Sequence, residues 1–220
     1  KGRFSGRILH VKGTGLLDLK EYKEGLFSVQ DEASALAADM SGAEAGDYVI
    51  DVCAAPGGKT AAIGEMMNNQ GTIKSFDIYE HKLSLIKEQA DRLGLKIIDT
   101  GIMDGSIGSV YLKEKADKVL ADVPCSGLGV IRHKPEIKYK EPKNLKALYE
   151  IQAAILEKSS EYLKNGGTLI YSTCTINDNE NGNQIREFMK RHDDFKIEAE
   201  KQFLPVEDID GFYICKMIKK

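Results

Sequence analysis

The chain has 220 residues, of which 42% are hydrophobic and 30% are charged, so it can bury one sizeable core. No apolar run approaches the roughly 20 residues of a membrane-spanning helix, and no signal segment opens the chain, so we expect a cytoplasmic protein without membrane contact. A formal charge of -3 argues weakly against a stand-alone nucleic-acid-binding domain, which usually has a basic balance.

Strands and helices alternate along the predicted chain. A helix over about 31–40 is followed by strands at 48–52, 72–76, 96–98, 118–121 and 167–171, and by helices from Gly58, across 83–93, from about Pro142 to Leu163 and around 185–189. This order predicts an α/β fold with a mostly parallel sheet and helices on both faces. Two extended segments, 195–197 and 212–218, have no helix between them and predict an antiparallel closing hairpin.

A glycine-containing loop, Asp51–Thr60, joins the first predicted strand to a helix, where backbone N–H groups can receive a ligand. A Walker A phosphate loop needs a glycine where Cys53 stands, which makes an NTPase improbable. The dinucleotide pattern Gly-x-Gly-x-x-Gly does not match residues 55–58 either. An adenosine cofactor without phosphate, such as S-adenosylmethionine, needs only the close backbone approach.

Two acidic residues follow the next predicted strands. Asp77 lies 20 residues beyond Gly57, where a carboxylate can accept hydrogen bonds from both ribose hydroxyls. Asp104 comes after the third strand, within reach of the exocyclic amine of an adenine. Taken alone, each is equally consistent with a solvent-exposed turn aspartate.

Two cysteines also follow predicted strands, Cys125 after Asp122-Val123-Pro124 and Cys174 after Ser172-Thr173. The four cysteines form no Cys-x-x-Cys pair and the histidines show no ligand spacing, so we expect neither a metal site nor a disulfide framework. A thiolate at a strand end is a candidate nucleophile, whereas Cys215 is expected to be inert and buried. Pro124-Cys125 alone favours the arrangement of DNA cytosine methyltransferases, and the chemistry alone leaves open which cysteine attacks.

Together, the three loops resemble the RNA cytosine carbon-5 methyltransferases of the Nop/Sun family, and within it the bacterial RsmB (Fmu) type that acts on 16S ribosomal RNA. The resemblance extends from about Gly25 to Tyr213 and implies the Rossmann-like S-adenosylmethionine-dependent methyltransferase fold, with a seven-stranded sheet. It implies S-adenosyl-L-methionine as cofactor. The cofactor-binding residues that it implies are Cys53, Ala54, Ala55, Pro56, Gly57, Gly58, Lys59, Asp77, Asp104 and Asp122.

The resemblance also assigns roles to the two thiols. Carbon 5 of cytosine is a poor nucleophile, and a thiolate added at carbon 6 turns the ring into an enamine that can accept a methyl group. In the family, the Thr-Cys cysteine attacks and the Pro-Cys cysteine helps release the product, which implies attack by Cys174 and release by Cys125. Asp122 is expected to hydrogen-bond the base, and Lys59 to polarise its oxygen 2 or hold Asp122. A solvated first-turn lysine is the alternative for Lys59.

RsmB-type proteins also carry an N-terminal helical RNA-binding domain, which nothing in this sequence resembles. We therefore expect residues 1–24 to be a connecting segment from a missing N-terminal region, and 25–220 to be a catalytic domain that acts as a monomer on RNA, most of all ribosomal RNA. Residues 1–23 have a net charge of +4, and a second basic cluster lies in 132–140; both could contact phosphates. A tRNA-directed enzyme of the same family and a non-catalytic RNA-binding or ribosome-assembly factor are the alternatives.

Overall fold

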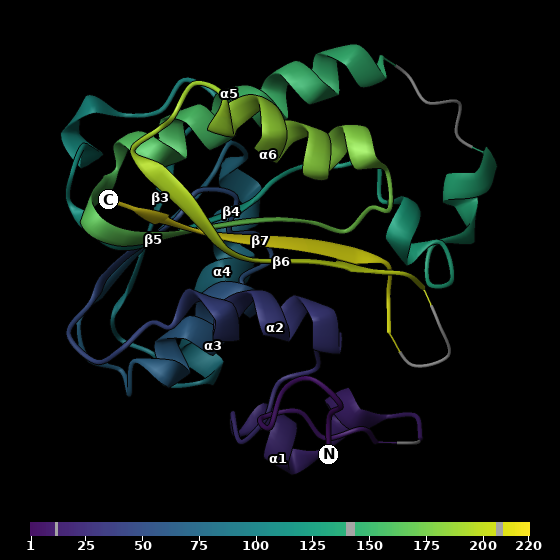
Figure 1. Cartoon of the computed structure of the whole chain (residues 1–220). Coiled ribbons are helices and arrows are strands. Elements are labelled where there is room, and N and C mark those ends of the chain that lie inside the picture. Colours follow the sequence, from purple (N-terminus) through teal and green to yellow (C-terminus); the bar gives the residue numbers. More distant parts are fainter. Residues whose placement is uncertain (12, 140–143, 206–208) are drawn as a thin grey trace.

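The computed structural model describes residues 1–11, 13–139, 144–205 and 209–220, which form a seven-stranded sheet with helices on both faces (Figure 1). The strands are β1 (Tyr48–Asp51), β2 (Thr72–Asp77), β3 (Ile98–Ile102), β4 (Ala116–Asp122), β5 (Leu163–Thr173), β6 (Phe195–Phe203) and β7 (Phe212–Lys219). The helices are α1 (Lys20–Lys23), α2 (Glu32–Ser41), α3 (Gly58–Met66), α4 (Glu80–Arg92), α5 (Leu145–Glu161) and α6 (Gly182–Met189). None of the described helices is long and apolar enough to cross a membrane.

The strand order is β3-β2-β1-β4-β5-β7-β6. Neighbours from β3 to β5 run parallel, and β7 runs antiparallel to both β5 and β6. The predicted α/β fold, a mostly parallel sheet closed by an antiparallel hairpin, is confirmed. The order reverses at β1, because the chain moves outward to β2 and β3 and then returns to β4. In doubly wound sheets, this switch point leaves a crevice beyond the carboxyl ends of the strands, where ligands bind.

Apolar side chains cover both faces of the sheet. On one face, Leu36 of α2 and Ile63 of α3 join a buried cluster with residues of the central strands. On the other face, Ile155 of α5 and Phe188 of α6 do the same, and Figure 1 shows these two helix layers on opposite sides of the sheet. Residues 167–173 of β5 are consequently all buried.

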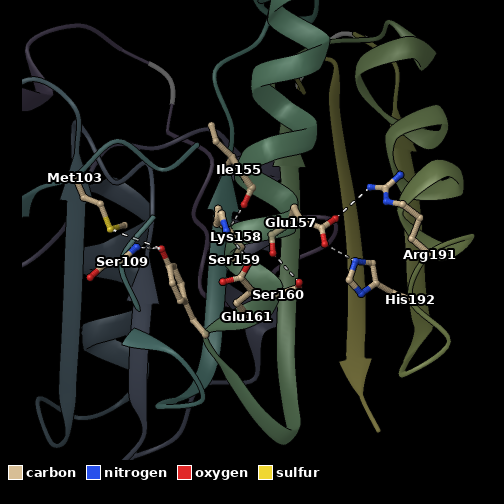
Figure 2. A network of polar contacts seen from close by, with 11 residues as sticks. Met103, Ser109, Ile155, Glu157, Lys158, Ser159, Ser160, Glu161, Arg191 and His192 are labelled. Carbon is tan, nitrogen blue, oxygen red and sulfur yellow. Dashed lines mark hydrogen bonds and ion pairs between the residues drawn. The ribbon is translucent and has the colours of Figure 1, made fainter. Parts of the chain in front are cut away.

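Polar contacts hold α6 against α5 (Figure 2). Glu157 of α5 accepts a hydrogen bond from Arg191 Nη2 at 3.2 Å, and its Oε1 lies 2.9 Å from His192 Nε2. The His192 ring also stacks on Phe188, with centroids 4.1 Å apart. Because the Arg191 and Glu157 side chains are partly exposed, this ion pair stabilises the fold by about 1 kcal/mol or less. The main effect of these contacts is to fix the orientation of the turn that follows α6.

The N-terminal segment packs onto α2 through Glu32. Its carboxylate accepts hydrogen bonds from the backbone N–H groups of Phe4 (2.6 Å) and Ser5 (3.0 Å), and its Oε2 lies 2.9 Å from His10 Nε2. Burial alone would raise the pKa of Glu32, but the two backbone hydrogen bonds lower it to about 2. Residues near the N-terminus are therefore part of the folded unit.

The third strand begins later than its sequence predicts. The prediction is 96–98, whereas β3 runs Ile98–Ile102. After α4 the chain makes a tight turn, in which Leu95 N donates to Ala90 O and Lys96 N donates to Asn69 Oδ1. Only then does the chain pair with β2, starting at Ile98.

The long predicted helix ends two residues earlier than predicted. Pro142, its predicted start, lies outside the described residues, and α5 begins at Leu145 after Asn144, whose side chain accepts a hydrogen bond from Ala147 N. The helix ends at Glu161 because Leu163 already pairs with Ala116 as the first residue of β5. The prediction of β5 from residue 167 is thus wrong at its start.

The edge strand β6 is longer than predicted. It extends from Phe195 to Phe203, not to 197, and its pairing with β7 continues as far as Phe203 and Phe212. As an edge strand it is mostly exposed and rich in charged residues, which is how natural sheets keep an open edge from pairing with other chains. Such a strand has little of the hydrophobic pattern on which the prediction depends.

Candidate active site

The loops after β1, β4 and β5 meet at the switch point of the sheet, because parallel strands bring their carboxyl ends to one edge. The loop after β4 carries Cys125 and the loop after β5 carries Cys174, and their Sγ atoms lie 3.0 Å apart. The loops are also tied by a backbone hydrogen bond from Gly129 N to Cys174 O, at 3.0 Å. Two cysteines 49 residues apart in sequence are thus in direct contact.

The contact makes the two thiols unequal. The hydrogen bond with Cys174 raises the pKa of Cys125 well above its usual range, and burial acts in the same direction. For Cys174, the hydrogen bond from Cys125 lowers the pKa, and the positive charge of Lys59 acts in the same direction, against burial. Of the two thiols, Cys174 is therefore the one that ionises more readily.

The other two cysteines are isolated from this pair. Burial raises the pKa of Cys53 well above its usual range, and burial also raises the pKa of Cys215 to about 12. Both stay protonated at neutral pH, so neither is a nucleophile. Within the described part of the chain, no three His, Cys, Asp or Glu side chains are grouped so as to hold a metal ion.

Lys59 and Asp122 form an ion pair beside the thiols. Lys59 Nζ donates to Asp122 Oδ2 at 2.6 Å, and Ser172 Oγ donates to the other oxygen of Asp122 at 2.7 Å. The side chains are 14% and 26% exposed, so the pair is only partly screened by water. Burial alone would lower the pKa of Lys59, but the charge and hydrogen bond of Asp122 raise it, and the ammonium persists.

A cavity of about 150 Å³ opens next to this ion pair. Pockets that enclose a whole small ligand usually measure about 300–1,000 Å³, so this one can hold only part of such a ligand. It is lined by Val29, Gln30, Ser34, Asp51, Cys53, Ala54, Ala55, Pro56, Gly58, Lys59 and Asp122. A second cavity, of about 390 Å³, lies between the end of α4 and β3 and is lined by none of the predicted site residues.

Asp51 shows that the cavity fits a ligand with a positive or hydrogen-bond-donating group. Its Oδ2 accepts a hydrogen bond from Thr60 Oγ1 at 2.6 Å, whereas its buried Oδ1 has no hydrogen-bond partner among the described residues. A bound donor would remove that deficit. With Asp122 in the same wall, two carboxyl groups can accept hydrogen bonds from the ammonium group of S-adenosylmethionine, whereas they disfavour a phosphate.

The remaining predicted cofactor residues do not line this cavity. Gly57 precedes α3 with a φ of 105°, and a Cβ atom there would lie 3.1 Å from the backbone of Ile86. Asp77 ends β2, with its Oδ1 accepting from Tyr79 N at 3.0 Å and lying 3.6 Å from Lys82 Nζ. Asp104 accepts from the N–H and hydroxyl of Ser106, at 2.9 Å and 2.6 Å. Contacts from Asp77 and Asp104 to the cofactor stay predictions.

Sequence reasoning missed Asp51, Gln30 and Ser34 as cavity residues. Asp51 is the last residue of β1, directly before the glycine loop, so its place at a strand end was a usable signal. Gln30 lies just before α2 and Ser34 in its first turn, and Gln30 Nε2 donates to Ser34 Oγ at 3.1 Å. They reach the cavity only through tertiary packing, for which the sequence carries no sign.

The basic cluster after Cys125 is partly paired with acidic groups. Arg132 Nε donates to Asp210 Oδ1 at 2.6 Å, and its Nη2 lies 3.5 Å from Asp31 Oδ2. His133 Nε2 lies 3.4 Å from the same oxygen of Asp210. Lys140 lies outside the described residues. Phosphate contacts by this cluster stay a prediction. The bond from Arg132 to Asp210, which lies between β6 and β7, also holds the loop after Cys125 in place.

Asp51 gives the fold a specific pH dependence. Burial raises the pKa of Asp51 to about 7 despite the hydrogen bond from Thr60, while an aspartate in an unfolded chain ionises near pH 4. The folded state therefore binds the proton more tightly, and the free energy of unfolding falls as pH rises, by about 4 kcal/mol in total between roughly pH 4 and 7. Above about pH 7, the contribution of Asp51 to the free energy of unfolding no longer changes with pH.

Asp51→Asn is expected to remove that slope, because the amide does not titrate. Urea unfolding of both proteins at pH 4.5, 6 and 7.5 measures the difference, in which all other titrating groups cancel. Equal slopes for the two proteins would show that Asp51 ionises normally in the fold.

Comparisons with known proteins identify the family of this chain. Residues 40–218 match the sequence profile of the family described as 16S rRNA methyltransferase RsmB/F. A probable ribosomal RNA small subunit methyltransferase B of Bacillus subtilis is 44% identical in an alignment of 230 positions. The alignment covers 96% of this chain and 51% of that protein. The ribosomal RNA small subunit methyltransferase B of Escherichia coli strain CFT073 is 36% identical over 213 residues, which cover 92% of this chain and 49% of that protein. The chain thus spans about half the length of the curated relatives it matches.

Two solved structures with 30% or more sequence identity to this chain have the same fold. The crystal structure of PH0851 superposes with a TM-score of 0.90 at 32% identity, over 94% of this chain and 51% of that one. NSun6 from Pyrococcus horikoshii, solved with the S-adenosylmethionine analogue SFG, superposes with a TM-score of 0.83 at 30% identity, over 93% of this chain and 56% of that one. The chain therefore belongs to the 16S rRNA methyltransferase RsmB/F family, whose members depend on S-adenosylmethionine.

Proposed function

We propose that this chain is the catalytic part of an enzyme that methylates carbon 5 of cytosine in RNA, through a transient covalent bond between Cys174 and the base. The observation that carries the proposal is the 3.0 Å contact between the Cys125 and Cys174 Sγ atoms at the switch point of the sheet. A protein that only binds RNA has no chemical need for two thiols in contact beside a cavity that can hold part of a cofactor.

The thiol pair fits the two halves of this reaction. The Cys174 thiolate adds to carbon 6 of the cytosine, and the electron pair of the 5,6 double bond moves to carbon 5, which becomes nucleophilic. S-adenosylmethionine, when bound, supplies an electrophilic methyl group. A water molecule then takes the carbon 5 proton, the electron pair of that C–H bond restores the 5,6 double bond, and the bond between carbon 6 and Cys174 breaks to release the thiolate. The Cys125 side chain lies close enough to Cys174 to take part in this second half.

Asp122 and Lys59 provide the electrostatic part of the site. Addition of a thiolate puts negative charge on the pyrimidine ring, and fixed donors at its nitrogen 3 and oxygen 2 edge would stabilise that charge. The Lys59 ammonium, held by Asp122 at 2.6 Å, is positioned to supply a positive charge and to hold the orientation of Asp122. The same ammonium lowers the pKa of Cys174.

The residues that would hold the cofactor are the walls of the 150 Å³ cavity together with the next two strand ends. Asp51 and the Cys53–Lys59 loop would bind one end of S-adenosylmethionine. We assign Asp77 and Asp104 to its ribose and adenine, because they follow β2 and β3, the next strands along the same edge of the sheet.

We further propose small-subunit ribosomal RNA as the substrate, because relatives across the matched length carry that name. In the same proposal, residues 1–24 are a connecting segment and 25–220 the catalytic domain, which works as a cytoplasmic monomer. The +4 charge of residues 1–23 would add sequence-independent affinity for RNA phosphates.

Methyl transfer to 16S rRNA tests the proposed reaction. The chain is incubated with labelled S-adenosylmethionine and, in parallel, with a 16S rRNA transcript or with tRNA, and the products are mapped by bisulfite sequencing. We expect label in 5-methylcytosine at one or a few positions. Label found only on a base nitrogen or a ribose hydroxyl, or label in tRNA alone, would contradict the reaction or the substrate, respectively.

Cofactor binding is tested separately by calorimetry. We expect S-adenosylmethionine and its demethylated product to bind in the low-micromolar range, and ATP and NAD to show no binding, because the cavity wall has two carboxylates and no phosphate-binding glycine pattern. Tight binding of ATP with none of S-adenosylmethionine would overturn the cofactor assignment.

A further inference from the structure

A fully buried carboxylate lies behind the two thiols. Glu180 ends the 3₁₀ helix Asp178–Glu180, between β5 and α6, and its exposed fraction is 0%. A buried carboxylate is costly unless hydrogen bonds replace its hydration. In this protein the donors come from the two cysteine loops and from α5, so the arrangement links elements that are far apart in the sequence.

One oxygen of Glu180 holds the Cys125 loop. Ser126 N, the residue after Cys125, donates to Oε2 at 2.8 Å, and Gln152 Nε2 donates to the same oxygen at 3.0 Å. Gln152 Nε2 also donates to the carbonyl oxygen of Pro124, the residue before Cys125, at 2.9 Å. The backbone on both sides of Cys125 is therefore fixed, directly or through one side chain, by Glu180.

The other oxygen of Glu180 reaches the Cys174 loop. Asn177 Nδ2 donates to Oε1 at 2.9 Å, and Thr175 Oγ1, next to Cys174, lies 3.5 Å from it. Ser126 Oγ donates to Oε1 at 2.6 Å and also lies 2.8 Å from Thr175 Oγ1. The residues that directly follow the two cysteines are thus joined to each other and to one carboxylate.

We propose that Glu180 is a positioning residue that sets the distance between Cys125 and Cys174. This inference rests on the proposed function, in which the two thiols act in turn on one base. A carboxylate has about four lone-pair sites and no donor, and both oxygens of Glu180 are occupied by donors from the two loops. An amide in its place would point an N–H group at one of those donors.

The geometry explains why this position affects chemistry as well as stability. The Sγ–Sγ contact of 3.0 Å lets the two thiols share a hydrogen bond, and this hydrogen bond lowers the pKa of Cys174. A shift of either loop by a fraction of an ångström lengthens this contact. Misplacement of reacting groups by about 1 Å can cost about 100-fold in rate.

Glu180→Gln tests the inference without relying on RNA methylation alone. Alkylation of each cysteine is followed by peptide mass spectrometry across pH 6–10, in the whole chain. We expect the profile of Cys174 to move to higher pH and its alkylation at pH 7 to fall at least tenfold. With substrate RNA, kcat is expected to fall about 100-fold, while the KM for S-adenosylmethionine stays within twofold.

Glu157→Gln is the matched control, since Glu157 contacts Arg191 and His192 on the outer side of α5 (Figure 2). It is expected to leave the alkylation profile unchanged. If Glu180→Gln does not fold, Ser126→Ala removes only the hydroxyl that joins Glu180 to Thr175 and should give a smaller shift in the same direction.

The outcomes separate the inference from the proposed function. An unchanged Cys174 profile in folded Glu180→Gln, or in folded Ser126→Ala where Glu180→Gln does not fold, overturns the positioning role even if activity is lost. A wild-type chain that shows the predicted alkylation profile but produces no 5-methylcytosine overturns the proposed function and leaves the thiol geometry standing.

Discussion

Replacing Cys125 with alanine is expected to trap a covalent complex between Cys174 and RNA, whereas Cys174→Ala is expected to abolish both the complex and methyl transfer. Without Cys174 the ring is never activated, and we expect the rate to fall on the order of 10⁴-fold or more, as when other covalent nucleophiles are removed. Without Cys125, addition and methyl transfer can still occur but release is blocked. The adduct should then appear as a band that resists denaturant on a gel.

The structure adds a condition to this experiment. Because the hydrogen bond from Cys125 lowers the pKa of Cys174, Cys125→Ala also removes part of what keeps the nucleophile ionised. Adduct formation in Cys125→Ala is therefore expected to be slow at pH 7 and faster at pH 9, and both pH values should be sampled. An adduct trapped in Cys174→Ala instead would assign attack to Cys125, and no adduct in either variant at either pH would refute a two-cysteine mechanism.

The fold is largely predictable because its strands carry strong local signals. The apolar runs of β1, β4 and β5 are buried on both faces, and the closing segment at 212–218 coincides with β7. The errors fall where non-local pairing decides the boundary. β5 starts four residues early because Leu163 pairs with Ala116, and β6 extends along β7 although its own residues are mostly charged.

The site is predictable in outline for a topological reason. Motifs at the ends of parallel strands must gather at one edge of the sheet, so the glycine loop, Asp122 and the two cysteines could be expected to lie near each other. The side-chain contacts among these residues could not be predicted. The partnerless oxygen of Asp51 depends on tertiary packing, and the fixing of the Cys125 loop by Glu180 depends on contacts with Gln152 and Ser126, which are 28 and 54 residues away in sequence. No local pattern encodes such distances.

Lys59→Met is expected to impair both the chemistry and the stability of the protein. The substitution keeps much of the side-chain volume but removes the charge that pairs with Asp122 at 2.6 Å and lowers the pKa of Cys174. We expect kcat to fall about 100-fold or more at pH 7, the size of effect seen when one electrostatic donor is removed from an active site. The free energy of unfolding should fall by about 1–3 kcal/mol, because Asp122 keeps its charge without its partner.

The pH dependence and a double variant distinguish the two effects of Lys59. Because the pKa of Cys174 rises when the ammonium is lost, part of the activity of Lys59→Met should return between pH 7 and 9, whereas an effect through stability alone would not reverse. Adding Asp122→Asn removes the unpaired charge and should restore stability but not activity. Lys164→Met is the control, since Lys164 pairs with Asp117 at 2.7 Å where β4 and β5 begin, and its side chain is 48% exposed. A pH profile of Lys59→Met parallel to that of the wild type would mean that Lys59 does not act on the thiols.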